Sequence, residues 1–327
     1  MLKRSSPIWI IATKDVADAM QDRFIIVVTA FLVAAALTAL VTGAVALATD
    51  VMTYNDARTT LLALGKSADA IAAPEFYPLR LLRGAVEQTE IIGAVIAILV
   101  GYRAAASERG RKTLALIMTR PIQNRQFMVG KALGGLMLLA GGLAIVFVLT
   151  AITLQVVSGV GLTLTDLGRI AIIWASSVVY AYSFFLLSFM LAFWLKKLPT
   201  ALLLSFSIWL LVVLVAPQIG DTLDPDNQVA GGVFKQLHIL KTDQIRIMRG
   251  YASFETIREG IEAASLTKRF ERLSFAVLGI KDTYVGKPLA SVLKEKQGDA
   301  LWLVLVVFVL QALLFSRPID LNRLTQE

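Results

Sequence analysis

The sequence predicts an all-α protein that crosses a membrane six times. Two observations carry this prediction. First, 57% of the 327 residues are hydrophobic and the mean hydropathy is +0.70. Second, the apolar residues gather in uncharged runs as long as a bilayer is thick, which a soluble core does not need. We expect a polytopic membrane protein with six transmembrane helices, an N-terminal interfacial helix and a helical extracytoplasmic insertion before the last span.

The elements can be placed in order along the chain. The six spans are expected within residues 24–49, about 87–103, 132–157, 170–195, 198–216 and 300–316. The intervening parts are an outer loop at 50–86, a cytoplasmic segment at 103–131, an extracytoplasmic domain at 218–299 and a tail at the end of 300–327. The first five spans thus occupy 24–217.

Residues 1–23 predict an amphipathic helix that lies among lipid headgroups on the cytoplasmic side. Trp9, Ala12, Val16 and Met20 recur at helical spacing within it, which forms one apolar face. A plain cytoplasmic tail is the alternative.

Charged residues (Asp, Glu, Lys and Arg) are absent from every span except the second. Glu87, Glu90 and Arg103 would belong to span two, and ionisable groups inside a membrane are functional candidates. We expect them near the ends of the helix, where their side chains reach the headgroups. A carrier or channel driven by an ion bound within the spans is therefore disfavoured.

Glycines make one face of the start of span three small, which lets a neighbouring helix approach closely. These glycines are Gly130, Gly134, Gly135, Gly141 and Gly142.

Basic residues predict the orientation. If the N-terminus is inside, the short inner segments carry three times as many Lys and Arg residues as the short outer segments, as the positive-inside rule requires. Six spans then leave the C-terminal tail inside as well. The same rule and contacts with headgroups explain the basic excess without nucleic acid as a partner.

The loop at 221–298 is long enough to be a small extracytoplasmic domain. Phe254, Ile257, Ile261 and Leu273 stand at near-helical spacing within it. At its start, Asp221, Asp224 and Asp226 favour a turn; a calcium site is the weaker alternative, because their spacing is not that of a calcium loop.

No catalytic or cofactor-binding constellation is recognisable. The chain has no cysteine and one histidine, His238, so neither a thiolate metal site nor a nucleophile with its base is indicated. The stretch from Gly110 to Thr113 lacks the glycine spacing of a phosphate-binding loop. We therefore expect no enzyme activity, cofactor or metal in this chain.

The cytoplasmic segment 103–131 predicts a docking element. A short helix begins near Ser107, Pro121 ends it, and a second helix at about 123–131 leads into span three. The first helix carries an apolar stripe made of Leu114, Ile117 and Met118. A bent, apolar-edged element with a charged rim suits a groove on a partner; a basic loop that only obeys the orientation rule is the alternative.

This segment resembles the hallmark of the membrane subunits of type-2 ATP-binding-cassette (ABC) exporters. The residues that match the hallmark in order are Glu108, Arg109, Thr113, Leu114, Leu116, Ile117, Arg120, Pro121, Arg125, Gly130 and Lys131. Lys112 stands where the family usually has glycine, and Gly110 lies two residues earlier. The chain is most similar to the permeases of nitrous-oxide-reductase maturation and gliding motility.

The resemblance implies a homodimer or pseudo-dimer of permeases in a prokaryotic plasma membrane, paired with two copies of a separate ABC ATPase that binds the ATP. Residues 107–121 would dock on the ATPase, with Glu108, Arg109, Arg120 and Arg125 as rim charges. The residues expected to couple to the ATPase are Glu108, Arg109, Gly110, Thr113, Leu114, Ile117, Met118, Arg120, Pro121, Arg125 and Lys131.

Two hypotheses about the output stay open beside each other. In the first, the complex exports a solute. In the second, it moves no solute but relays ATP-driven motion through 221–298 to an extracytoplasmic protein partner.

Overall fold

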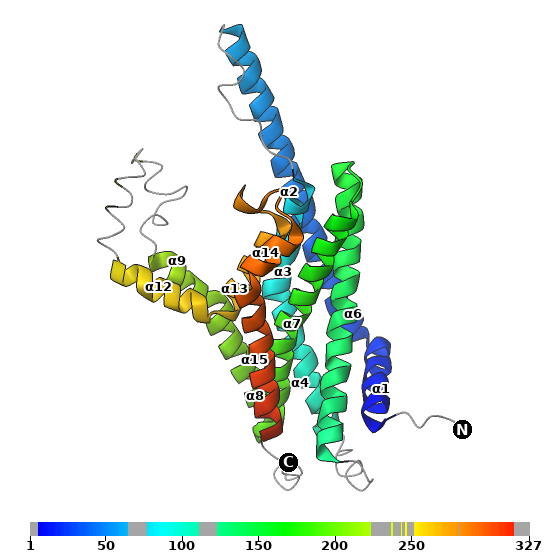
Figure 1. Ribbon diagram of the computed structural model, residues 1–327. Coiled ribbons are helices and arrows are strands. Elements are labelled where there is room, and N and C mark those ends of the chain that lie inside the picture. Colours follow the sequence, from blue (N-terminus) through cyan, green and yellow to red (C-terminus); the bar gives the residue numbers. More distant parts are fainter. Residues whose placement is uncertain are drawn as a thin grey trace.

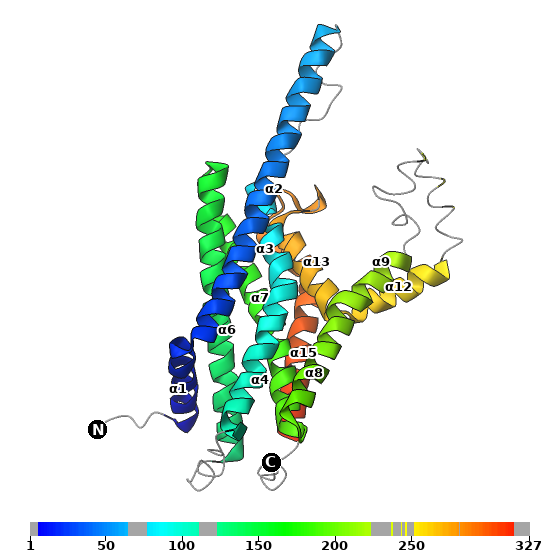
Figure 2. The same ribbon diagram turned by 180° about the vertical axis from the view of Figure 1, so that it is seen from behind.

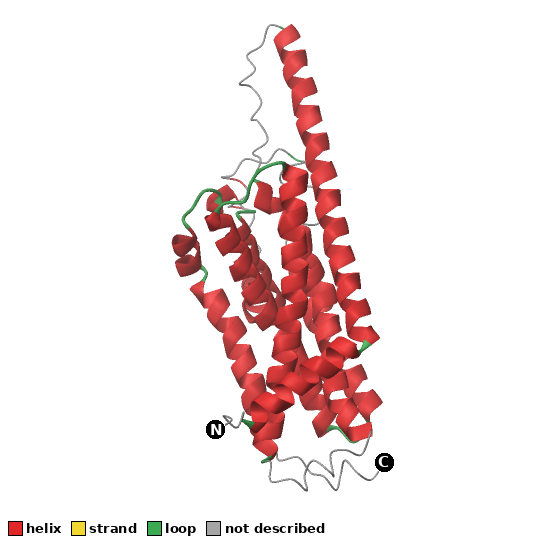
Figure 3. Cartoon of the chain, turned by 90° about the vertical axis from the view of Figure 1, so that its right-hand side faces the viewer, coloured by secondary structure: helices red, strands yellow, loops and turns green. Residues whose placement is uncertain are grey.

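The computed structural model describes residues 6–64, 77–110, 123–223, 237, 243, 246, 252–280 and 282–316. Within these ranges the regular elements are helices and there is no strand (Figure 3). Six of the helices are long and apolar enough to cross a membrane. The predicted all-α fold with six spans is confirmed.

The helices follow one another along the bundle (Figure 1). They are α1 (Pro7–Gln21), α2 (Arg23–Ala63), η2 (Pro78–Leu82), α3 (Arg83–Gln88), the π-helical η3 (Thr89–Gly93), α4 (Ala94–Gly110), α6 (Asn124–Ser158), α7 (Leu164–Trp194), α8 (Leu198–Trp209), the π-helical η4 (Leu210–Val215), α9 (Ala216–Leu223), α12 (Ala252–Ala264), α13 (Leu266–Leu278), η6 (Asp282–Tyr284), α14 (Leu289–Glu295) and α15 (Gln297–Ser316). Each predicted span coincides with one of the long helices or helix series.

The bundle has two distinct ends, which Figures 1 and 2 show from opposite sides. The α1 end holds α1, the ends of α4, α7 and α15, and the beginnings of α6 and α8. The α14 end holds η6, α14 and the beginning of α15. Between the two ends, α9 and α12 pack on each other and lean sideways out of the bundle.

The prediction of an outer loop at 50–86 is wrong for the described residues 50–63 and 78–86, which are helical. Helix α2 continues to Ala63, so its 41 residues extend ~60 Å, about twice the ~30 Å of a hydrocarbon core. Residues 50–63 contain no glycine or proline to end the helix. The polar side chains mark the end of the membrane span, but they do not end the helix.

Span two also begins earlier than predicted. Pro78 starts a helical series that runs to Gly110, and proline is well suited to a first helical turn. Glu90 therefore lies well inside the series rather than near its end, where the sequence had placed it. Lys268 and Glu271 of α13 are among the charged groups that act on it, so its nearest charges come from another helix of the protein.

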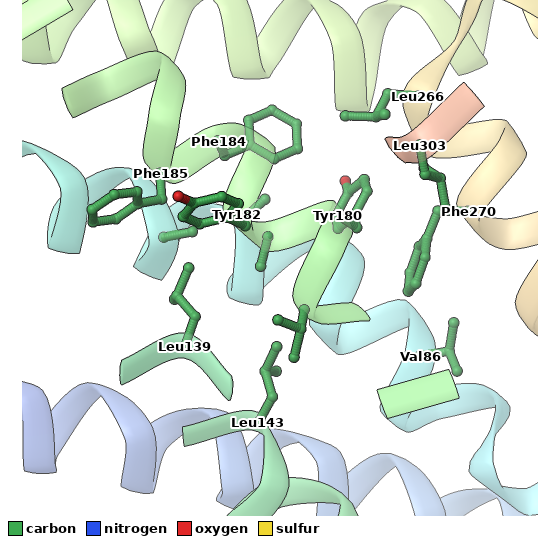
Figure 4. Packing of buried hydrophobic residues seen from close by; sticks show 14 of the residues in the cluster. Val86, Leu139, Leu143, Tyr180, Tyr182, Phe184, Phe185, Leu266, Phe270 and Leu303 are labelled. Carbon is green, nitrogen blue, oxygen red and sulfur yellow. The ribbon is translucent and has the colours of Figure 1, made fainter. Parts of the chain in front are cut away.

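Helix α7 is the centre of the bundle. In its most apolar stretch 67% of the residues are buried, against 50% or less in the other candidate spans. Its aromatic side chains interlock with those of other helices and with each other (Figure 4). Tyr180 stacks on Phe270 of α13 with 4.5 Å between the ring centroids, and Phe185 stacks on Phe189 at 5.5 Å.

Polar groups on these α7 aromatics reach the backbones of neighbouring helices. The Tyr182 hydroxyl donates to the carbonyl of Ala132 at 3.2 Å, and the Trp174 indole N–H donates to that of Ala140 at 3.0 Å. The Tyr180 hydroxyl donates to the carbonyl of Glu90 at 3.0 Å, within the π-helical η3. These bonds tie α7 to α6 and to η3.

Helix α13 belongs to the bundle and not to a separate outer domain at 218–299. Phe270, Leu273 and Val277 are at most 3% exposed, and α13 packs against α7 and α15. Ser265 caps its N-terminus by accepting from the N–H of Lys268, which splits the predicted apolar stripe between α12 and α13. Gly279 ends it in the left-handed conformation.

Four of the five glycines on the predicted small face of span three have a neighbouring helix within 4 Å of where a Cβ would lie. A Cβ on Gly135 would lie 2.0 Å from the ring of Phe185, while one on Gly141 would meet nothing within 4 Å. The absence of a side chain at Gly135 therefore allows α6 and α7 to pack closely. Gly130 and Gly134 face α1.

We expect Gly135→Ala to lower the stability of the protein by ~1–3 kcal/mol, because the buried ring of Phe185 must shift. Gly141→Ala, the same change on the same helix, is expected to be neutral or slightly stabilising, since alanine is the better helix former. Thermal unfolding in detergent measures both. Equal melting temperatures for the two variants would contradict this packing.

Candidate functional site

The structure describes both ends of the segment that the sequence singles out, residues 103–131. Glu108, Arg109 and Gly110 end α4, while Arg125 and Lys131 lie in the first turns of α6. Both helices continue unbroken into the bundle, so the described ends of the two predicted short helices, 107–110 and 124–131, are extensions of spans two and three. The other candidate residues lie outside the described residues: Thr113, Leu114, Ile117, Met118, Arg120 and Pro121.

Lys131 is the centre of a buried ion cluster at the α1 end. Its ammonium group lies 2.7 Å from a carboxylate oxygen of Glu108 on α4 and 2.8 Å from one of Asp15 on α1. The side chain of Lys131 is 4% exposed. It also lies over the ring of Phe127, with 5.8 Å from the nitrogen to the ring centroid. One cation therefore holds three helices together.

Two glycines of α6 bring α1 into reach of Lys131. A Cβ on Gly130 would lie 2.8 Å from that of Ile11, and one on Gly134 would lie 3.1 Å from that of Asp15. The face of α1 that packs on the bundle therefore contains Ile11, Ala12 and Asp15. The position of α1 among headgroups stays a prediction.

The predicted apolar face of α1 divides between two environments. Ala12 is buried, whereas Trp9 is 51% and Met20 69% exposed. Part of the predicted face thus points away from the protein, where an interfacial helix would contact lipid.

Burial raises the pKa of Asp15 above its ordinary value, and Lys131 opposes this rise as the second largest influence. The attraction to Lys131 does not fully offset the free energy needed to bury the Asp15 carboxylate, since removal of an ion from water is costly. The two carboxylates of the cluster therefore depend on Lys131, because its removal takes away the cation that both of them contact.

Arg109 joins α4 to the end of α7. Its guanidinium group donates to the carbonyls of Ala192 at 2.5 Å and Leu195 at 2.8 Å, and also to that of Lys196. The last carbonyls of a helix lack partners within the helix, and a guanidinium fork can serve several of them at once. Arg109 is thus a side-chain cap on α7.

The prediction that Glu108 and Arg109 are rim charges on a docking surface is wrong. They are 8% and 7% exposed, because Lys131 and the end of α7 engage them within the bundle. Arg125, in contrast, is exposed, as a rim residue must be.

Arg169 makes a similar joint at the α14 end, and the sequence analysis missed it. It lies on α7, is 3% exposed, and donates to the carbonyls of Val277 at 2.5 Å and Lys287 at 2.6 Å. It thereby holds the end of α13 and the loop before α14. The sequence does contain a signal, because Arg169 directly precedes the apolar run of span four. It was counted only as a basic residue of an outer segment under the positive-inside rule.

The described residues offer no alternative site for a metal ion. Within the ranges given above, no group of three or more His, Asp or Glu residues is arranged to hold one. Of the three candidates for calcium, Asp221 lies in α9, and Asp224 and Asp226 lie outside the described residues. In the ion cluster both carboxylates bond the ammonium group of Lys131 and come from different helices, so we interpret it as a joint between helices rather than a reaction centre.

The fold and this joint define an all-α multi-pass membrane protein whose second and third spans are clamped together beside a charged segment. The sequence matches the family described as ABC-2 family transporter protein over residues 9–317. The chain therefore belongs to this family, and it is the membrane-embedded permease subunit of an ABC transporter whose ATPase is a separate subunit. A comparison with curated proteins found no match.

We expect Lys131→Met to destabilise the protein by ~3–5 kcal/mol, because it leaves two buried carboxylates without their cation. Arg125→Met removes the same charge from an exposed position of the same helix and is expected to change stability little. Thermal unfolding of both variants in detergent measures the difference. If Lys131→Met melted no earlier than Arg125→Met, the cluster would not be a structural joint.

Proposed function

We propose that this chain is the permease of an exporter in which ATPase subunits act on the coupling segment, defined as residues 103–131. One observation carries the proposal: the two ends of this segment are joined, since Glu108 of α4 and Lys131 of α6 form a buried ion pair. A displacement of the segment therefore moves spans two and three together. The match to the family supports the ATPase as the source of the displacement.

The contacts at the α1 end spread such a displacement further. Asp15 adds α1 to the joined pair, and Arg109 adds the end of α7. Four helices then respond as one body to a force on the coupling segment. Closure of the ATPase subunits on ATP would rotate this body against that of a second permease.

We infer the orientation in the membrane from the segments that meet at the α1 end of the bundle. The beginning of α1, the end of α15 and both ends of the coupling segment lie together there (Figure 1), and the basic residues favour the cytoplasm for this end. We place it in the cytoplasm of a prokaryotic cell, with two permeases and two ATPase subunits in the complex.

Leu114→Asp is expected to lower ATP hydrolysis by the reconstituted complex several-fold, because a carboxylate in the apolar stripe cannot enter an apolar groove without a partner charge. Activity of the purified permease–ATPase complex in liposomes is the measurement. Thr59→Asp provides the control, since it adds the same charge to an exposed residue of α2 far from the coupling segment. Unchanged activity of a correctly inserted Leu114→Asp variant would argue against docking at this segment.

A second function, relay of motion to an extracytoplasmic partner, is favoured by the contacts of α7. Arg109 holds this helix at the α1 end and Arg169 holds α13 and the loop before α14 at the other. A movement of α7 would therefore displace the α14 end directly. Deletion of 221–298 is no fair test of the relay, because it removes the buried helix α13.

Arg169→Met tests the relay without a deletion. We expect it to keep ATP hydrolysis but to abolish the ATP-dependent shift of a spin label at Lys294 on α14, measured as a distance to a second label at Gln123. Arg83→Met, which removes an exposed arginine near the same end, should leave the shift intact. A normal shift in the Arg169→Met variant would rule out this path for the motion.

A further inference from the structure

An apolar groove opens in the side of the bundle, away from the ion cluster. Its volume is about 460 Å³. The helices around it are α7, the series α8–η4–α9, the joint between α12 and α13, and α15. Its lining residues include Phe184, Leu187, Val212, Ile261, Leu266 and Leu310.

The lining offers few polar groups for recognition. Its two hydroxyl side chains, Ser183 and Ser265, are already engaged with backbone groups of their own helices: Ser183 donates to the carbonyl of Val179 at 3.1 Å, and Ser265 accepts from the N–H of Lys268 at 3.2 Å. No charged residue lines the groove. Its occupant must therefore be apolar where it contacts the protein.

Three walls of the groove belong to candidate membrane spans, Leu164–Trp194, Leu198–Ile219 and Gln297–Ser316. The groove therefore lies at the depth of the hydrocarbon core, where the surrounding medium consists of acyl chains. Its opening follows from the fold, since α9 and α12 lean away from α7 and α15 (Figures 1 and 2). Its volume falls in the ~300–1,000 Å³ range of small-molecule sites.

Charged residues and a tryptophan follow directly beyond the lining, on α12, α13 and α15. Arg269 lies over the ring of Trp302, 5.0 Å from its centroid, and bonds Asp299 at 3.2 Å; Arg272 pairs with Glu262. Such residues are typical of the headgroup level of a membrane. An apolar slot beneath a headgroup-level rim is the shape that a single lipid molecule fits.

We propose that this groove is a lipid site that holds one acyl chain of a bilayer lipid between spans four, five and six. The proposal needs only that the chain is inserted in a membrane, and it is independent of where the ATPase docks. Because the groove involves α13, an occupant would contact the helix that Arg169 ties to α7. The lipid is thus placed where it can be moved by the permease or can hold α13 in position.

The test uses the full chain in lipid nanodiscs with a phospholipid that carries a photoactivatable diazirine on its acyl chain. After irradiation, mass spectrometry locates the labelled residues. We expect groove residues such as Val212 and Leu310 to be labelled several-fold more than Leu301 and Phe308, which are 66% and 64% exposed on α15.

Ala264→Trp fills the groove and is expected to reduce the labelling of its lining several-fold. Leu305→Trp places the same side chain at an exposed position of α15 and should change nothing. Ala216→Trp is a second filling variant, so that failure of one variant to fold, seen as early thermal unfolding, does not end the test.

Three results would overturn the proposal. Equal labelling of groove and exposed residues would reveal only the lipid that surrounds any membrane protein. Labelling of the groove that persists in a folded Ala264→Trp or Ala216→Trp variant would place the lipid elsewhere. Cross-links in the groove between two copies of the chain would make it a dimer contact.

Discussion

A single buried ammonium group constrains the architecture of the α1 end. Lys131 satisfies Glu108 and Asp15 at once, and without it two carboxylates would stand in a protein interior that cannot solvate them. The ion pair between Glu108 and Lys131 joins α4 to α6, the two helices on either side of the coupling segment. A displacement of that segment is therefore transmitted to α1, α4 and α6 together.

Helix α7 extends this unit across the membrane. It is the most buried span, and its aromatic side chains are packed or hydrogen-bonded along much of its length. An arginine makes hydrogen bonds at each end of α7. Arg109 of α4 donates to the last carbonyls of α7, and Arg169 of α7 donates to the backbone of α13 and the following loop. A long helix held in this way can pass a displacement between the two sides without any chemical group that reacts, which fits a permease whose energy comes from another subunit.

The sequence was sufficient for the spans and the family but not for the joints. Uncharged apolar runs and the distribution of Lys and Arg can be read from neighbouring positions in the sequence, so all six spans were predictable. The partner of Lys131 on α1, Asp15, lies 116 positions away in the chain, and no local pattern reveals such a contact. Residues 221–298 were expected to form an outer domain, although Phe270 and Leu273 of α13 lie in the core; amphipathicity alone does not say which surface covers the apolar face of a helix.

The proposed coupling requires that an ATPase subunit binds the charged stretch between the second and third spans. A photoreactive amino acid at Leu114 in the intact complex tests this most directly, with one at Thr59 as reference. Illumination should join Leu114 of this chain covalently to the ATP-binding subunit, more strongly when nucleotide is present, and should join Thr59 to no such subunit. Adducts to the ATP-binding subunit from Thr59 but none from Leu114 would place the motor at the opposite end and contradict the account.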